Sequence, residues 1–197
     1  MTATSLSGRR GVGISPRLRT LLVVVVTSIG ILGLSWAINN PTADGLTEID
    51  INVGPGAAPA VGAPPPDFAA VTIDGESFRL DDFAGRPVWL TFGASWCADC
   101  RAEAVDLQAT YEAFRADGLV IVGVFIQEDA AAVREYAGRV GFDFTMTADP
   151  RAEIAAAYRT LGIPTHYFIG ADGLIRQVRI GALDRDDMER LVRELIG

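Results

Sequence analysis

The only two cysteines of the chain, Cys97 and Cys100, are separated by two residues. Two thiols at this spacing can open and close one disulfide bond, which is the chemistry of thiol-disulfide exchange. The apolar run 87–93 before the pair predicts a strand, and the three- and four-residue apolar spacing of 97–116 predicts a helix. The pair therefore lies where a helix begins, and free N–H groups and the helix dipole favour a thiolate at Cys97.

Other uses of the two cysteines are less well supported. A structural zinc ion needs about four ligands, and the chain adds only His166, so no metal site is expected. A purely structural disulfide across so short a loop would stabilise little, because it removes little loop-closure entropy. Two inert buried thiols remain an alternative, but Trp96 and the strand-to-helix position favour redox chemistry.

Two segments of the sequence resemble a known superfamily. Residues 92–100 (FGASWCADC) look like the active-site segment of the thioredoxin superfamily, and residues 162–165 (GIPT) look like its cis-proline loop. Glu103 matches the active-site glutamate of the TlpA/ResA-like branch, which includes CcmG/DsbE-like, membrane-anchored thiol-disulfide oxidoreductases of cytochrome c maturation. The resemblance covers residues 63–197. Asp99 replaces the usual proline, so the family's reduction potential does not carry over.

The resemblance implies roles for residues near the cysteines. Cys97 would attack a disulfide, and Cys100 would attack the resulting mixed disulfide and release the partner. Glu103, one helical turn from Cys100, would oppose thiolate formation and could accept the proton of Cys100. Glu128 resembles a second acidic position of the branch. His166 is expected to be a packing residue.

The same resemblance implies a substrate-binding surface. Pro164 is expected in the cis form, which would leave the backbone of Ile163 free to pair with an extended substrate segment. Thr165 completes this loop, and Trp96 would form a wall beside it. The implied partners are protein thiols or disulfides, apocytochrome c among them, and a membrane electron donor. No cofactor is implied beyond the redox-active disulfide.

Other functions on the same fold remain alternatives. A peroxiredoxin-like thiol peroxidase would carry threonine or serine three residues before its reactive cysteine, and this chain has Ala94 there. A binding module without turnover would not need the intact Cys-x-x-Cys pair. Thiol-disulfide exchange is therefore the predicted activity, in the direction of protein-disulfide reduction.

Charge is distributed unevenly along the chain. The formal net charge is −8, and all 25 acidic residues follow residue 40, whereas arginines at 9, 10, 17 and 19 make the beginning basic. An acidic main domain argues against a nucleic-acid partner, because nucleic acids require a basic face. At 197 residues, the chain has room for one domain and appendages.

The first third of the sequence predicts export. Residues 1–20 form a basic cytoplasmic end, and the uncharged run 21–38 approaches the ~20 residues that span a bilayer. The arginines would keep the beginning inside, so we expect a transmembrane anchor with the domain outside the cytoplasm. A signal peptide cleaved after the small-x-small residues 35–37 is the alternative. Residues 39–66, rich in proline, glycine and alanine, predict a flexible linker.

Residues 67–197 predict an α/β thioredoxin-like three-layer sandwich, preceded by one transmembrane helix. We expect a β-hairpin on a two-residue turn at Asp74 and a central insertion at 127–144. Over the rest of the domain, we expect strands at 87–93 and 119–125, one strand within the run 161–169, and another at 174–180. We expect helices at 97–116, 129–139, 149–160 and from 184 onward.

Overall fold

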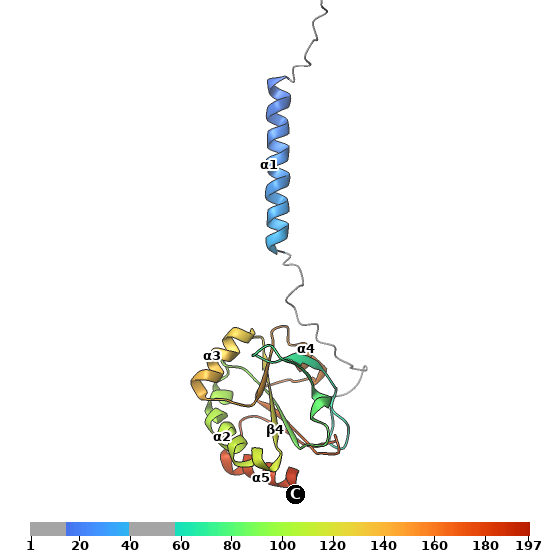
Figure 1. Cartoon of the computed structure of the whole chain (residues 1–197), viewed down its shortest axis with the longest axis vertical. Helices are drawn as coiled ribbons and strands as arrows, with labels where there is room; N and C mark the ends of the chain where they lie inside the picture. The colour runs from blue at the N-terminus through green and yellow to red at the C-terminus, as the bar shows by residue number, and fades with distance from the viewer. Residues whose placement is uncertain (1–14, 40–57) are drawn as a thin grey trace, which may run out of the picture. The chain divides into compact units, whose positions relative to one another are not determined.

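The computed structural model describes residues 15–39 and 58–197. The chain divides into two compact units, Met1–Leu46 and Thr47–Gly197. In the first unit, α1 (Pro16–Asn39) is a continuous helix (Figure 1). The basic residues before position 15 and the linker residues 40–57 lie outside the described part of the chain.

The predicted transmembrane helix at 21–38 coincides with α1. Within the described ranges, the structure contains no helix with the combined length and apolar character that crossing a membrane requires. The expected helix is present, but the expected membrane span is not supported by the structure.

The second unit is built on a mixed five-stranded sheet with the order β5-β4-β3-β6-β7. The central strand β3 (Val88–Gly93) is parallel to β4 (Val120–Ile126) and antiparallel to β6 (Thr165–Ile169). The edge strands are β5 (Thr145–Asp149), parallel to β4, and β7 (Ile175–Ile180), antiparallel to β6. The three inner strands are buried almost throughout, which requires cover on both faces of the sheet.

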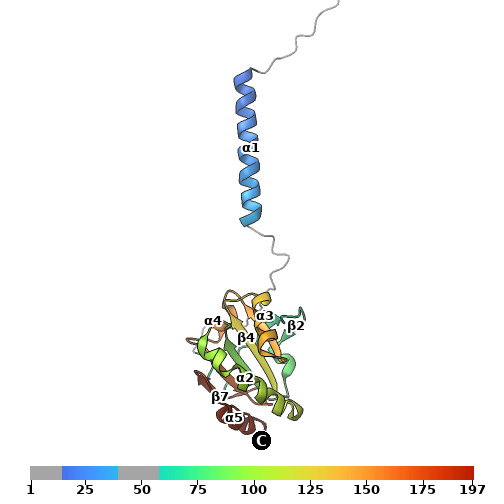
Figure 2. The same ribbon diagram turned by 90° about the vertical axis from the view of Figure 1, so that its left-hand side faces the viewer.

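Helices and a hairpin supply this cover and form the outer layers. One face packs on α2 (Ala98–Phe114), α3 (Ala130–Val140) and α5 (Arg185–Ile196), which lie to the left of β4 in Figure 1 and towards the viewer in Figure 2. The other face packs on α4 (Glu153–Ala157) and on the hairpin that precedes the sheet. The predicted thioredoxin-like three-layer sandwich is confirmed.

The N-terminal hairpin is present, but its turn is longer than predicted. Strands β1 (Ala69–Val71) and β2 (Ser77–Arg79) pair antiparallel, with Val71 opposite Ser77. The expected two-residue turn is wrong because Thr72 organises the loop instead. Its N–H donates to the carbonyl of Glu76, and its hydroxyl oxygen accepts the N–H of Glu76 at 3.1 Å.

Edge strand β5 was not predicted from the sequence, and the helix after it is shorter than predicted. The helix predicted at 149–160 is only the five residues of α4, and residue 149 ends β5. Asp149 is fully buried and accepts the N–H groups of Glu153 at 2.7 Å and Ala155 at 2.9 Å. Its carboxylate therefore caps α4, while the left-handed backbone at Ala152 and Arg159, with φ of 55° and 49°, limits the helix at both ends.

Candidate active site

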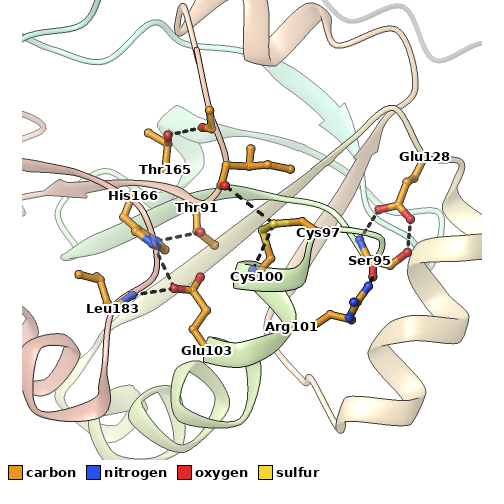
Figure 3. The surroundings of a disulfide bond; sticks show 12 residues. Thr91, Ser95, Cys97, Cys100, Arg101, Glu103, Glu128, Thr165, His166 and Leu183 are labelled. Carbon is orange, nitrogen blue, oxygen red and sulfur yellow. Dashed lines mark hydrogen bonds and ion pairs between the residues drawn. A yellow bond between two sulfur atoms is a disulfide. The ribbon is translucent and has the colours of Figure 1, made fainter.

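The cysteine pair occupies the turn from β3 into α2. Cys97 is the N-cap of α2, and it forms a disulfide with Cys100 in the first turn of the helix (Figure 3). The backbone N–H of Cys100 donates to the sulfur of Cys97 at 3.2 Å. The exposed fractions of the two residues are only 8% and 9%. The predicted position at a helix N-terminus is confirmed, and the N–H that reaches Cys97 favours a thiolate there when the pair is reduced.

A buried carboxylate fixes the loop before the cysteines. Glu128 accepts the backbone N–H of Ser95 at 2.7 Å with one oxygen and the hydroxyl of Ser95 with the other. From the opposite side, the guanidinium of Arg101 donates to the carbonyl of Ser95 at 3.1 Å. Ser95 is therefore held by three contacts two residues before Cys97, and both oxygens of Glu128 are occupied.

Glu103 lies on the other side of the disulfide from Glu128 (Figure 3). Only 4% of it is exposed, although the sequence alone would allow a solvated residue on the helix surface. Its Oε2 accepts the N–H of Leu183 at 3.0 Å and lies 3.5 Å from Nε2 of His166. Its Oε1 has no hydrogen-bond partner in the part of the chain that the structure describes. One oxygen therefore positions the side chain, and the other is available to accept a proton.

His166 is fully buried, as expected of a packing residue, but it also contacts Glu103. Its Nδ1 lies 3.2 Å from Nε1 of Trp89 and 3.0 Å from the hydroxyl of Thr91. Because an indole N–H can only donate, Nδ1 is the acceptor, and the neutral ring carries its proton on Nε2, which faces Glu103. At 3.5 Å this N–H makes no well-formed hydrogen bond, but its dipole favours the carboxylate.

The loop before β6 approaches the disulfide from a third side. The peptide bond between Ile163 and Pro164 is cis, as the resemblance implied. The sulfur of Cys97 lies 3.8 Å from the carbonyl oxygen of Ile163. Thr165 donates its hydroxyl to the carbonyl of Gly162 at 2.6 Å, which closes the loop on itself. The two segments named by the resemblance are therefore in contact.

Exposed apolar side chains adjoin, in sequence, the cysteine pair and the cis-proline loop. Trp96, directly before Cys97, is 53% exposed. Leu161, just before the cis-proline loop, is 97% exposed and was not among the residues predicted to bind substrate. An apolar residue beside this loop could equally be buried, so the sequence pattern alone does not predict the exposure of Leu161.

Several contacts of the site were not predicted because their members are far apart in sequence. Glu103 meets Leu183 and His166, and Ser95 meets Glu128, only after the sheet has formed. Glu128 itself was named from the family resemblance and from its place at the end of a strand, but its contact with Ser95 was not predicted. No pattern in the sequence links Glu103 to the segment before α5.

A buried disulfide at a helix N-terminus, beside a cis-proline loop on this sheet, defines a thioredoxin-like thiol-disulfide oxidoreductase. Comparisons with known proteins agree. Residues 61–178 match the model of the AhpC/TSA family. The thiol-disulfide oxidoreductase ResA of Geobacillus kaustophilus is 31% identical over 133 residues, covering 68% of this chain and 76% of that protein.

Solved structures extend the comparison. A thiol:disulfide interchange protein of the thioredoxin family from Chlorobium tepidum is 28% identical with a TM-score of 0.64, over 71% of this chain and 100% of that one. A secreted Mycobacterium tuberculosis disulfide oxidoreductase homologous to E. coli DsbE is 27% identical with a TM-score of 0.59, over 65% of this chain and 96% of that one. The chain belongs to the AhpC/TSA family, among its ResA-like thiol-disulfide oxidoreductases, and its redox-active pair is Cys97–Cys100.

Proposed function

We propose that this oxidoreductase reduces disulfides of proteins outside the cytoplasm. The observation that carries the direction is the burial of the Glu103 carboxylate behind the cysteine pair. A buried negative charge opposes a second negative charge nearby, so it disfavours the thiolate of the reduced pair. A reduced form that is less stable gives its electrons more readily, because the reduction potential falls as the reduced form is destabilised.

The reaction proceeds in two exchanges. The thiolate of Cys97 attacks one sulfur of the substrate disulfide, which forms a mixed disulfide and releases the other substrate sulfur as a thiol. The sulfur of Cys100 then attacks the sulfur of Cys97, forms the Cys97–Cys100 disulfide and expels the second substrate sulfur. Two electrons pass from the dithiol to the substrate, which ends as two thiols.

Glu103 is the base in the second exchange. Cys100 must lose a proton before its sulfur can attack, and Glu103 follows it by one helical turn. The availability of Oε1 in Glu103 supports this role. Glu128 is less suited to it, because Ser95 already binds both of its oxygens.

The backbone of Ile163 binds the substrate beside the disulfide. Its N–H donates no hydrogen bond to any residue in the described part of the chain. An extended substrate segment can pair with this group as a short added strand. Trp96 and Leu161 are exposed on the adjoining segments and would contact apolar substrate side chains. Pro164 and Thr165 hold the loop in shape.

The likeness to ResA-like proteins supports a place in cytochrome c maturation or related redox chemistry of the cell envelope. The substrates would be oxidised cysteine pairs of exported proteins such as apocytochrome c. A membrane protein would return electrons to Cys97–Cys100. The basic residues before position 20 and the uncharged run 21–38 support export, and the M. tuberculosis relative is described as secreted.

Trapping of mixed disulfides tests this function. The Cys100→Ser variant should attack through Cys97 but fail to release its partner, so disulfide-linked adducts should accumulate with an oxidised Cys-x-x-Cys-His peptide. The Cys97→Ser variant should form none. Equal trapping by the two variants would contradict the order of attack, and consumption of hydrogen peroxide by Cys100→Ser at a peroxidase's rate would favour the peroxidase alternative instead.

A further inference from the structure

Tyr136 on α3 has a hydroxyl that the reaction above does not use. Only 4% of the residue is exposed, and within the described chain its hydroxyl has no hydrogen-bond partner. Its ring packs edge-on against Phe125 and Phe142, with centroids 5.9 and 5.8 Å apart. The guanidinium of Arg139 lies 5.9 Å from the ring centre. The ring is therefore held firmly, and a buried hydroxyl in a fixed position requires a partner.

Tyr136 lines a small cavity beneath the first turn of α2. The cavity has a volume of about 20 Å³, and Cys100 and Glu103 also line it. Thr91 contributes the remaining polar side chain, and much of the lining is aromatic. A space of this size holds one water molecule when two to four polar groups surround it. The cavity thus joins the resolving cysteine, the carboxylate and the unpaired hydroxyl.

We propose that this cavity binds one water molecule, anchored by the hydroxyl of Tyr136, which carries the proton of Cys100 to Glu103 during the second exchange. Tyr136 is then a positioning residue for the reaction, supplied by α3. The proposal rests on the proposed function, because it concerns the step in which Cys100 releases the substrate.

The donors and acceptors around such a water molecule match. Tyr136 donates its O–H to the water oxygen, and the thiol of Cys100 donates its S–H to the same oxygen. The water donates one O–H to the available oxygen of Glu103. When Cys100 attacks Cys97, its proton passes to the water and a water proton passes to the carboxylate. The water is regenerated, and no other reactant is needed.

The surroundings of Tyr136 keep its hydroxyl protonated, so that it can donate a hydrogen bond throughout the reaction. Burial raises the pKa of the Tyr136 hydroxyl; Arg101 opposes this change, and the negative charges of Glu103 and Glu128 add to it. Arg139 also lowers the pKa of this hydroxyl. The hydroxyl therefore keeps its proton at neutral pH and can orient the water throughout the reaction.

The test is the Tyr136→Phe variant, which removes the hydroxyl and keeps the ring. Reduced full-length protein is mixed with an aromatic disulfide whose thiol absorbs light, and stopped flow separates the attack of Cys97 from the release by Cys100. We expect an unchanged first phase and a second phase slowed about tenfold at pH 7, a small part of what a general base contributes. The loss should shrink as the pH rises past the ordinary thiol pKa of about 8.5, because a growing fraction of the thiol then ionises without help.

Tyr111→Phe is the matched control. Tyr111 packs against Phe144 at 5.8 Å in the same aromatic cluster but does not line the cavity. The second phase of the Tyr111→Phe variant should therefore proceed at the wild-type rate. In addition, the double variant Tyr136→Phe with Glu103→Gln should be no slower than Glu103→Gln alone, because both changes interrupt one proton path. A high-resolution crystal structure should show a water bonded to the Tyr136 hydroxyl.

Several results would overturn the proposal. The proposal fails if Tyr136→Phe shows a second phase at the wild-type rate at every pH, or a loss of rate that does not depend on pH. It also fails if the two tyrosine variants lose equal rate, if the losses in the double variant are additive, or if the crystal structure shows a dry cavity. Failure of the proposed function is distinguishable, because Cys100→Ser would then trap no adduct and the wild type would show no separate second phase.

Discussion

Replacing Glu103 by glutamine tests the electrostatic control of the cysteine pair. The change keeps the volume, and the amide oxygen can still accept the N–H of Leu183, but the negative charge is lost. For a carboxylate and a thiolate at a reference separation of about 8 Å and an effective dielectric constant of about 20, Coulomb's law gives a repulsion of about 2 kcal/mol. Little of this is screened by water, because Glu103 is 4% exposed. The thiolate equilibrium should shift by a factor of about 30.

The assay is the rate of alkylation of reduced protein as a function of pH. Glu103→Gln should react faster near neutrality, because its thiolate forms at lower pH. Its reduction potential should rise by about 30 mV for each tenfold stabilisation of the reduced form. Turnover should nevertheless fall, because Cys100 would lose its base.

Glu112→Gln is the control for this experiment. Glu112 is an exposed glutamate on the same helix, and it accepts a hydrogen bond from Gln108. Loss of its charge should leave the alkylation profile unchanged. Superimposed profiles and equal turnover for Glu103→Gln and wild type would refute the argument, since they would mean that the charge does not reach the sulfurs.

Two further predictions concern stability and export. Burial raises the pKa of Asp149 above 3.8, although backbone N–H groups oppose this. The folded state then holds the proton more tightly than the unfolded state, so the free energy of unfolding should fall as the pH rises from about 4. Asp149→Asn should flatten this pH dependence, as measured by denaturant titrations. An unchanged slope would contradict it. A reporter enzyme that works only outside the cytoplasm, fused after Gly197, should be active, and deletion of residues 1–38 should abolish its activity. Cell fractionation then distinguishes the two forms of export: full-length protein in the membrane pellet indicates an uncleaved anchor, and a soluble product that begins near residue 38 indicates a cleaved signal peptide.

Much of the fold followed from local patterns. The strand 87–93 was predicted because it is a continuous apolar run, which is buried in the structure. The helix that starts at the cysteines and the last helix were predicted because each buries apolar side chains at helical spacing. Strand β5 was missed because its sequence, Thr-Met-Thr-Ala-Asp, has only one large apolar side chain. Its pairing with β4 and the bridge from Thr72 to Thr147 determine its structure. These are tertiary contacts, and they override local preference.

The centre of the site was predictable for a different reason. Cys97, Cys100 and the cis-proline at Pro164 belong to short motifs, so each could be found without knowing the packing. Tyr136 belongs to no motif. Its importance depends on the cavity it shares with Cys100, and that cavity exists only because α3 and α2 cover the same face of the sheet.

Burial and hydrogen bonding distinguish the three acidic residues near the cysteine pair. Asp99, between the cysteines, is exposed, so water and salt screen its charge despite its position. Glu128 is buried, but the N–H and hydroxyl of Ser95 bind both of its oxygens and compensate its charge. Glu103 is buried with one oxygen bound to Leu183 and the other facing no donor among the described residues. A carboxylate influences a nearby thiol only when it is neither screened nor fully compensated. Of the three, only Glu103 meets both conditions, so we expect loss of its charge to change the thiolate equilibrium more than loss of either of the other two charges.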